Sequence, residues 1–389
     1  MKRVLAILMS VLVMKCVSTY AQLPMGFSLC NDEIVIETFT LQEKGRVEYM
    51  ASVLKSSYDA PHVICLFNET KLAHEMERGE AIFTDTVIAA MLLNPLKEEL
   101  DGVKKIFFIP SGKLHLFAIE YCNAGKGQML ADKYDFYRLT TSNILTHRDE
   151  KNSKSTSYVI FGGIDFDMTP NFEEQYEGNM QMCRYGYLQD SYEAALNIHN
   201  YLTEIGFHGM IYANEKATES AFKTLPWKDI RFFLIETHGV VVPKRGKRIN
   251  PDALMLAGAS YVMEGGIVPT GAEDGLLTIE DITNLDMSHV DLAVISACKS
   301  ALGGIDNQGV KGLMSAFKAA GVNSLVMTTD DVVDYVSGEV WKEFFRNIAN
   351  GMSKRESLLN AVKHIKTIHD GFYSSPKFWT PFVLIDGTN

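Results

Sequence analysis

Two apolar segments of this chain each lead into a side chain that can take part in covalent chemistry. Residues 232–237 read Phe-Phe-Leu-Ile-Glu-Thr and precede His238, and residues 292–297 read Leu-Ala-Val-Ile-Ser-Ala and precede Cys298. An imidazole can take the proton from a thiol, and the thiolate that results attacks carbonyl carbons. The pair therefore predicts acyl transfer through a thioester, with His238 acting first as general base and then as general acid.

Both segments have the composition of buried strands. Apolar runs of this length, separated by helical patterns, are typical of a parallel sheet that is covered by helices on both faces. In such sheets, ligands bind beyond the carboxyl ends of the strands. Because His238 and Cys298 each follow the end of a predicted strand, we expect both at the same edge of the sheet.

The residues beside this pair fit a catalytic role. Gly239 permits a tight bend, and its backbone N–H and that of Cys298 are predicted to form an oxyanion hole. Lys299 adds a positive charge that favours the thiolate, unless it points into water. Other histidines lie in predicted strands or helices and are interpreted as structural or solvated, namely His62, His115, His199, His364 and His369.

Composition bounds the class of protein. The 389 residues are 47% hydrophobic and 22% charged, enough for one large or two modest domains with a sizeable core. The formal net charge of -11 argues against a nucleic-acid partner. The sequence has no Cys-x-x-Cys and no His-x-x-x-His, so it predicts no metal site, and it predicts no cofactor.

The first residues have the layout of a secretory signal peptide. Lys2 and Arg3 precede an apolar stretch, residues 4–14, and small residues lead to Ala21. We expect cleavage after Ala21, which makes residues 1–21 the signal peptide of a secreted or periplasmic protein. The stretch is too short for a membrane span, so none is expected after cleavage. An uncleaved anchor and a buried first strand are the alternatives.

Five of the six cysteines follow residue 21, and an odd number leaves at least one thiol free. Apart from Cys298, we interpret them as small buried hydrophobic residues rather than disulfides, because their neighbourhoods are apolar and their spacing shows no pairs. These are Cys30, Cys65, Cys122 and Cys183.

A polar stretch at residues 148–157 predicts a linker between two parts of the chain. Residues 22–147 have the pattern of a mixed α/β half, with strands expected at 33–39, 60–67 and 105–110 and a helix at 86–100. Residues 158–389 alternate strands and helices. Strands are expected there at 158–163, 210–212, 232–237, 290–297, 324–328 and 382–385, helices at 191–202, 220–223, 309–320, 337–349 and 354–367, and a hairpin within 254–268.

The order of these motifs resembles the CHAT family, caspase-like peptidases related to separase and the caspases. Thr237-His238-Gly239 is similar to the histidine motif of that family, and Ser296-Ala297-Cys298 is similar to its cysteine motif. Five further segments are similar to segments of that family, namely residues 107–115, 158–165, 274–278, 312–322 and 379–382. The similarity covers nearly the whole chain after residue 21, and the two motifs are specific only in this combined order.

The resemblance implies an α/β fold of the caspase type: a three-layer sandwich with a mostly parallel sheet at residues 158–389, preceded by a degenerate α/β half at residues 22–147. It implies that His238 and Cys298 lie on adjacent strands and act as a dyad without a fixed third member. The implied activity is that of a cysteine endopeptidase that cuts proteins or peptides. The helical repeats of many relatives are absent from the sequence, so a separate protein would supply any regulatory function.

The chain departs from the family pattern beside the cysteine. The family usually has Glu-Thr-Gly there, whereas this chain has Lys299-Ser300-Ala301, and Asp330 stands where the family often has Trp. In related peptidases the residue two before the nucleophile lines the substrate pocket, and by resemblance this is Ser296. Asp330 and Asp331 would favour Lys or Arg before the scissile bond, although acids also precede helices as caps alone.

Two other functions stay open. The altered residues 299–301 also fit a catalytically silent binding module that keeps the fold. The same dyad could serve an acyl hydrolase, although the chain has no Gly-x-Ser-x-Gly motif. The basic loop at residues 243–250 is interpreted as solvated rather than as a cleavage or docking site.

Overall fold

The structure is a computed structural model, and it describes residues 28–388 apart from 44, 148–154, 169–184, 243–251 and 307–308. Contacts divide the chain into a first unit, residues up to 150 together with 385–389, and a second unit, residues 151–384. The predicted signal peptide, Cys183, most of the predicted linker and the 243–250 loop lie outside the described residues. Among the described helices, none is long and apolar enough to cross a membrane.

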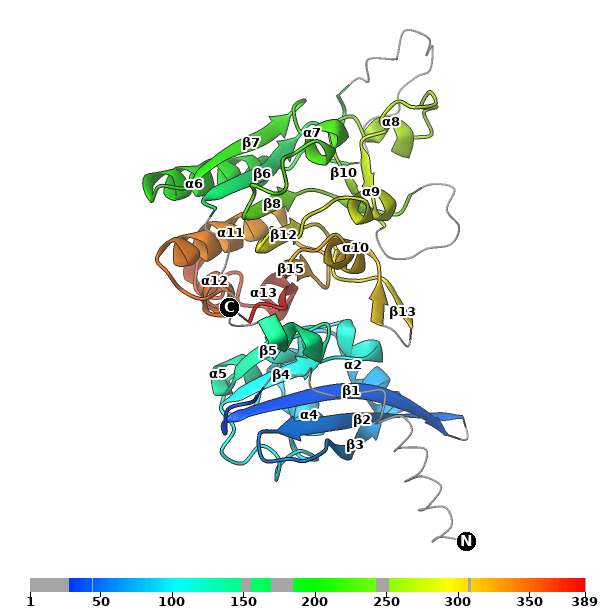
Figure 1. Cartoon of the computed structure of the whole chain (residues 1–389), viewed down its shortest axis with the longest axis vertical. Coiled ribbons are helices and arrows are strands. Elements are labelled where there is room, and N and C mark those ends of the chain that lie inside the picture. Colours follow the sequence, from blue (N-terminus) through cyan, green and yellow to red (C-terminus); the bar gives the residue numbers. More distant parts are fainter. Residues whose placement is uncertain are drawn as a thin grey trace. The chain divides into compact units, whose positions relative to one another are not determined.

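The first unit contains strands in the order β3-β2-β1-β4-β5 (Figure 1). The first three strands pair antiparallel, and the last two continue the sheet in parallel. The strands are β1 (Glu33–Glu43), β2 (Arg46–Lys55), β3 (His62–Asn68), β4 (Lys105–Ile109) and β5 (Asp135–Arg138). The helices are α2 (Glu69–Met76), α3 (Ala81–Thr84), α4 (Val87–Leu93) and α5 (Leu130–Lys133), with 3-10 turns η1 (Gly112–His115), η2 (Ile119–Tyr121) and η3 (Ser142–His147).

Three of the strands predicted for this unit are confirmed, and the predicted helix is shorter than expected. Strands β1, β3 and β4 lie where the sequence predicts them, whereas β2 and β5 are not predicted. The helix expected at 86–100 ends at Leu93. Pro95 follows two residues later and has no N–H with which to continue the helical hydrogen bonds.

The second unit is built on strands in the order β16-β15-β12-β8-β6-β7. Every pairing from β15 to β7 is parallel. The strands are β6 (Ser157–Ile164), β7 (His208–Asn214), β8 (Phe232–Glu236), β12 (Leu292–Ser296), β15 (Ser324–Thr328) and β16 (Phe382–Ile385). All six lie where the sequence predicts them. They are recognisable in the sequence because strands that are buried on both faces are nearly continuous apolar runs.

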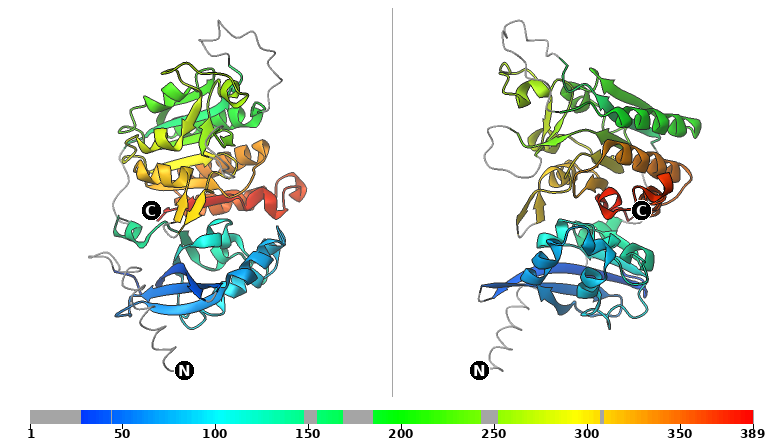
Figure 2. Two further views of the ribbon diagram at one scale, coloured as in Figure 1. Left: turned by 90° about the vertical axis from the view of Figure 1, so that its right-hand side faces the viewer. Right: turned by 180° about the vertical axis from the view of Figure 1, so that it is seen from behind.

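Helices cover both faces of this sheet. Phe232 packs on Phe345 with ring centroids 5.4 Å apart, while its neighbour Phe233 packs on Phe317 at 5.9 Å. Successive side chains of a strand point to opposite faces, so these two helical partners lie on opposite sides. One side holds α6 (Gln189–Glu204), α11 (Asp334–Ala349) and α12 (Lys354–Ile365), of which α6 and α11 lie side by side in Figure 2. The other holds α7 (Glu219–Lys223) and α10 (Leu313–Ala319). The predicted α/β fold with a mostly parallel sheet between helices is confirmed.

Smaller elements extend from the edge of the sheet that carries His238 and Cys298. Strands β9 (Gly239–Val240), β10 (Ala253–Met255) and β11 (Leu276–Thr278) form an antiparallel sheet of their own. The prediction of a hairpin within 254–268 is therefore wrong. Strand β10 pairs instead with β9, which precedes that segment, and with β11, which follows it. The remaining elements are α8 (Ser260–Met263), α9 (Ile279–Thr283), β13 (Gly304–Asp306), β14 (Gly309–Lys311), η4 (His369–Gly371) and α13 (Pro376–Trp379).

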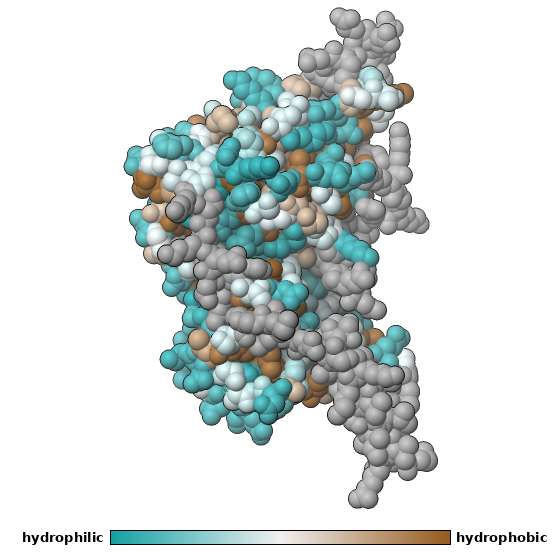
Figure 3. All heavy atoms as spheres, in the orientation of Figure 1, coloured by the Kyte–Doolittle hydropathy of each residue, from teal (hydrophilic) through white to brown (hydrophobic). Residues whose placement is uncertain are grey.

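The face of the molecule in Figure 3 carries apolar residues in small areas among polar ones. The most exposed large apolar side chains of the described residues are Ile267 at 79% and Phe372 at 71%. Scattered apolar side chains are common on folded proteins and by themselves indicate no binding site.

Candidate active site

The two chemically reactive residues follow neighbouring strand ends. Strands β8 and β12 are adjacent and parallel, with Glu236 opposite Ser296. The pairing continues by one step, since the Thr237 N–H donates to the Ser296 carbonyl oxygen at 3.0 Å. His238 and Cys298 each stand two residues beyond the last paired residue, and both are partly exposed. The register of the sheet therefore brings them to the same edge.

The imidazole of His238 is held by a main-chain oxygen. Its Nε2 lies 2.9 Å from the carbonyl oxygen of Gly186, and a carbonyl oxygen can only accept a hydrogen bond. Nε2 therefore carries the hydrogen, and the neutral ring keeps its lone pair on Nδ1. Phe166 and Tyr185 lie against the ring, with centroids 4.8 and 5.6 Å away. These contacts fix a tautomer in which Nδ1 is the basic atom.

Among the hydrogen bonds of the described residues, none joins the imidazole of His238 to the sulfur of Cys298. Catalytic hydrogen bonds are often long in a protein without substrate and tighten once the substrate is bound. Proton transfer between the two groups therefore needs a bridging water molecule or a change in side-chain torsion. None of the described residues accepts a hydrogen bond from the Cys298 backbone N–H, which leaves this donor available.

Two hydroxyl groups shape the turn that carries Cys298. Ser300 Oγ donates to the Ile295 carbonyl oxygen at 2.9 Å, and Thr328 Oγ1 donates to the Ala297 carbonyl oxygen. The Thr328 N–H donates in turn to Ser300 Oγ at 3.0 Å. The turn is thus tied both to its own strand, β12, and to the neighbouring strand, β15.

Of the three residues that differ from the family pattern, Lys299 alone has a backbone conformation that favours glycine. Lys299 has φ of 55°, in the left-handed region that favours glycine. Ala301 keeps a negative φ, and its N–H donates to the Thr328 carbonyl oxygen at 2.8 Å. Alanine in place of the usual glycine at 301 is therefore compatible with this turn.

The thiol of Cys298 is protonated at rest. Burial raises its pKa, the Val332 backbone N–H and the Lys299 charge lower it, and the charge of Asp331 raises it. Lys299 Nζ lies 2.8 Å from the Asp331 carboxylate and 3.7 Å from that of Asp330. The expected help of Lys299 to the thiolate is therefore offset by the carboxylates with which it pairs.

This balance predicts opposite effects for two charge-removing substitutions. Asp331→Asn should lower the pKa of the Cys298 thiol, because it removes a neighbouring negative charge and releases Lys299. Lys299→Met should raise it. The measurement is the rate of alkylation of Cys298 by iodoacetamide against pH, read by mass spectrometry, with Cys30 in the same digest as internal control. Shifts of the same sign in both variants would contradict this account.

The residues predicted to line a substrate pocket differ in their exposure to solvent. The side chains of Asp330 and Asp331 are 69% and 67% exposed and lie beside Cys298 through their shared contact with Lys299. Ser296 is 4% exposed and lies within β12 below them. The capping alternative does not apply, since Val333 is the N-cap of α11 and makes no side-chain capping bond.

Asp334, an acid that no sequence motif indicates, interacts electrostatically with His238. Asp334 is the first residue of α11, and its Oδ2 accepts the Asp190 N–H at 2.9 Å, which ties α11 to the start of α6. Burial raises its pKa, and hydrogen bonding from Asp190 and the positive charge of His238 lower it. Burial is the largest of these effects, so the pKa of Asp334 is raised overall. No local pattern identifies Asp334, because its role depends on contact between two distant helices.

A second missed acid, Glu236, ends β8 two residues before His238. It is 2% exposed, and neither carboxyl oxygen accepts a hydrogen bond from the described residues. Burial and the nearby charge of Asp334 raise its pKa well above the usual range. These surroundings favour the neutral form of the carboxyl group. In the sequence it is concealed within an apolar run.

The other described cysteines are free thiols in different surroundings. Cys122 is buried, as predicted. Cys30 and Cys65 are exposed, so their interpretation as buried residues is wrong. Cys30 lies before β1 and Cys65 lies in β3, a strand at the edge of its sheet, where side chains on one face meet water.

Comparisons with known proteins agree with the order of the motifs. The model of the CHAT domain matches residues 86–387. Tetratricopeptide repeat protein 28 of Mus musculus is 31% identical over 110 residues, which cover 28% of this chain and 4% of that protein.

Among solved structures, the chain is similar to gingipain R, an Arg-specific cysteine proteinase, with a TM-score of 0.44 and 10% identity over 77% of this chain and 66% of that one. It is also similar to the separase–securin complex of Saccharomyces cerevisiae, with a TM-score of 0.45 and 12% identity over 76% of this chain and 17% of that one. The chain thus spans only part of the length of each of these relatives.

Proposed function

The chain belongs to the CHAT-domain family, and from this premise we propose that it is a cysteine endopeptidase in which Cys298 and His238 hydrolyse peptide bonds. The observation that carries the proposal is the register of β8 and β12, which sets both residues just beyond the ends of adjacent parallel strands. An imidazole and a thiol at one sheet edge are the groups that covalent acyl transfer requires.

The proposed reaction begins with a neutral pair. Because burial raises the pKa of Cys298, Nδ1 of His238 takes the thiol proton as the sulfur attacks the peptide carbonyl carbon. The carbonyl oxygen becomes an oxyanion, to which the backbone N–H groups of Cys298 and Gly239 donate. The imidazolium then protonates the leaving amine as the C–N bond breaks. Water, deprotonated by the same Nδ1, hydrolyses the thioester and restores the thiol.

Two contacts support His238 in this role. The Gly186 carbonyl oxygen holds Nε2–H throughout, so the proton is exchanged only at Nδ1. The negative charge of Asp334 lies close enough to His238 to interact with it, and an opposite charge stabilises the imidazolium that we propose forms in the first step. Asp334 acts here as a positioning residue, because it contacts neither sulfur nor substrate.

For specificity, we propose that Ser296, Asp330 and Asp331 belong to a subsite that prefers Lys or Arg before the scissile bond. Lys299 neutralises one of the two exposed carboxylates, which leaves one negative charge beside Cys298. A peptide library varied at this position measures the preference. Selection of apolar or acidic residues there would remove this part of the proposal.

Covalent capture tests the activity directly. An acyloxymethyl ketone or epoxide probe should label Cys298 in the folded protein and leave the exposed thiols of Cys30 and Cys65 unlabelled. The label should disappear in Cys298→Ser and after denaturation of the native chain. Failure to label Cys298 in the folded protein would favour a catalytically silent binding module.

We also propose that the substrates are proteins or peptides outside the cytoplasm, and that a regulatory protein acts from a separate chain. The signal-peptide layout of residues 1–21 supports export to the periplasm or the medium. The mass of the exported protein should correspond to a chain that begins at Gln22. An exported chain that keeps Met1 would contradict the cleavage.

A further inference from the structure

A cavity of about 320 Å³ lies in the second unit, and none of the proposed catalytic or specificity residues lines it. This volume falls in the range of small-molecule sites, roughly 300–1,000 Å³. Its walls come from residues 218–220, residues 257, 258 and 261, and residues 272–275, together with Met168 and Val268. The lining combines apolar side chains with the carboxyl groups of Glu219, Glu273 and Asp274.

Glu219 lines this cavity and has one carboxylate oxygen without a hydrogen-bond donor. Its side chain is 7% exposed, and its Oε1 accepts a hydrogen bond from Lys223 Nζ at 2.7 Å. Its Oε2 is buried and accepts no hydrogen bond from the described residues. Burial raises the pKa of Glu219, and the charges of Asp274 and Glu273 raise it further. A buried carboxylate oxygen without a donor is unfavourable, so a cation bound close to Glu219 would be favoured over a neutral or negatively charged group.

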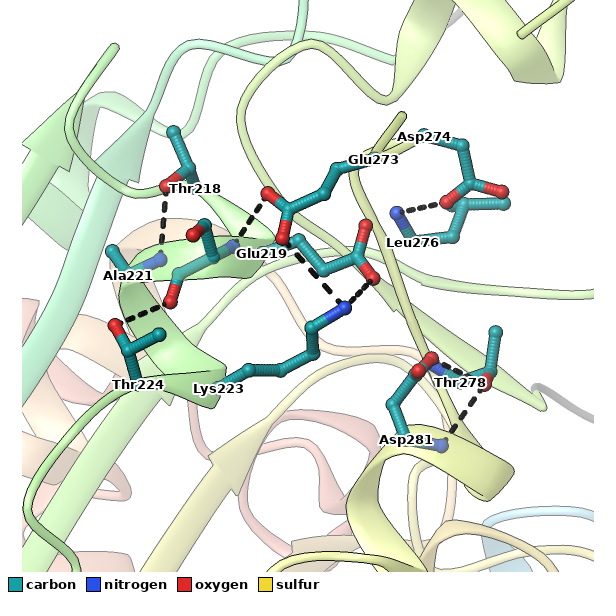
Figure 4. Close-up of polar contacts among 11 residues, drawn as sticks. Thr218, Glu219, Ala221, Lys223, Thr224, Glu273, Asp274, Leu276, Thr278 and Asp281 are labelled. Atoms are coloured by element: carbon teal, nitrogen blue, oxygen red, sulfur yellow. Dashed lines mark hydrogen bonds and ion pairs between the residues drawn. The ribbon is translucent and has the colours of Figure 1, made fainter. Parts of the chain in front are cut away.

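The charges around the cavity do not balance. Figure 4 shows Glu219 and Glu273 converging on the ammonium of Lys223, which lies 3.6 Å from the Glu273 carboxylate. Two carboxylates pair with the one ammonium and a third, Asp274, lines the same cavity, so the lining carries more acids than bases. Backbone donors hold two of the acids in place, because Glu273 accepts the Ser220 N–H at 2.7 Å and Asp274 accepts the Leu276 N–H at 2.9 Å.

The lining indicates the kind of cation. Within the described part of the chain, no group of three or more His, Cys, Asp or Glu side chains is arranged to hold a metal ion. Apolar contacts from Met168, Ala257 and Tyr261 suit a hydrocarbon stem instead. A guanidinium presents five donors in one plane and bonds several carboxylate oxygens at once. We propose that this cavity binds an alkyl guanidinium, carried either by an arginine side chain or by a small guanidine.

The test is calorimetric titration of the full-length chain bearing Cys298→Ala, so that binding is measured without peptide cleavage. The probes are n-butylguanidinium, the blocked tripeptide Ala-Arg-Ala, and the same peptide with neutral citrulline in place of arginine. We expect at least one guanidinium probe to bind and the citrulline peptide to bind about tenfold more weakly or not at all, because a charge-assisted contact is lost. Binding of both guanidinium probes assigns an arginine side chain, and binding of n-butylguanidinium alone assigns a small guanidine.

Variants locate the binding. Glu219→Gln should weaken it by about tenfold or more, whereas Glu264→Gln, an exposed acid outside the cavity, should leave it unchanged. If Glu219→Gln does not fold, Asp274→Asn decides, because asparagine still accepts the Leu276 N–H while removing a charge.

Absence of binding, equal binding of the citrulline peptide, or binding that survives the cavity variants would overturn the proposal. Binding that is lost only in the double variant Asp330→Asn/Asp331→Asn would also overturn it, and would assign the cation to the region of Cys298. Because the readout is binding by a chain without the thiol, the result is independent of whether the protein is a peptidase.

Discussion

Replacing Cys298 with alanine is expected to abolish peptide-bond cleavage while the protein stays folded. Cys298 is the one thiol that the described residues place at this sheet edge, and the proposed intermediate forms on its sulfur, so we expect a loss of at least about a thousandfold. The change removes one partly exposed sulfur atom and leaves intact the hydroxyl contacts of Ser300 and Thr328 that hold the turn. The measurement compares new peptide termini in a protein mixture after incubation with the native chain and with Cys298→Ala.

A matched set of variants shows whether the two residues act together. His238→Ala should lose activity to a similar degree, and the double variant should be little worse than either single one, because both remove the same step. Cys65→Ala removes an exposed thiol elsewhere in the chain and should cleave normally. Cleavage retained by Cys298→Ala, or strictly additive losses, would rule out the proposed dyad.

Asp291→Asn is expected to lower the free energy of unfolding of the second unit by about 3–5 kcal/mol. Lys354 Nζ lies 2.5 Å from Asp291 Oδ1, and these side chains are only 6% and 8% exposed. Ser324 Oγ is a third member of this contact, at 3.1 Å from Nζ. The pair fastens the first turn of α12 to the residue before β12. Without the carboxylate, a buried ammonium loses its opposite charge.

The loss in Asp291→Asn should depend on pH. Burial already lowers the pKa of Lys354, and Asp291 is the main group that raises it again. The variant should therefore hold this proton less tightly when folded than when unfolded, where lysine titrates near pH 10.4. Because the unfolded chain then binds more protons, stability should rise as pH increases towards that value, and the deficit should be largest at lower pH.

Urea unfolding at several pH values measures this effect. All three tryptophans, Trp227, Trp341 and Trp379, lie in the second unit, so their fluorescence follows the part of the chain that contains the pair. In the double variant Asp291→Asn/Lys354→Met both charges are gone, and much of the stability should return. An Asp291→Asn protein that is as stable as the native chain at neutral pH would contradict the inference.

The sequence predicts the elements whose signal is local. Strands β8 and β12 are continuous apolar runs, so the amino-acid pattern alone identifies both strands and the residues that end them. Strand β10 is missed because its partners are residues 239–240 and 276–278, which lie outside the segment expected to form a hairpin. Strand pairing across such distances leaves no periodic pattern in the strand itself.

The groups around the dyad are harder to predict for the same reason. The sequence identifies Lys299, but its pairing with Asp331 arises because the two residues follow the neighbouring strands β12 and β15, and this pairing offsets the expected effect of Lys299 on the thiol. Asp334 acquires its place only when α6 and α11 pack together. The unsatisfied oxygen of Glu219 depends on a cavity whose walls come from distant segments.

The partner of the His238 ring has a consequence for how this site can vary. Gly186 contributes its carbonyl oxygen, and every amino acid carries that same atom. No codon change at position 186 can delete the contact outright, unlike the loss of an Asp or Asn side chain in a conventional triad. A mutation that removes this contact would instead have to move the peptide group of residue 186. A comparison of side chains among homologues would therefore not detect the loss of this contact.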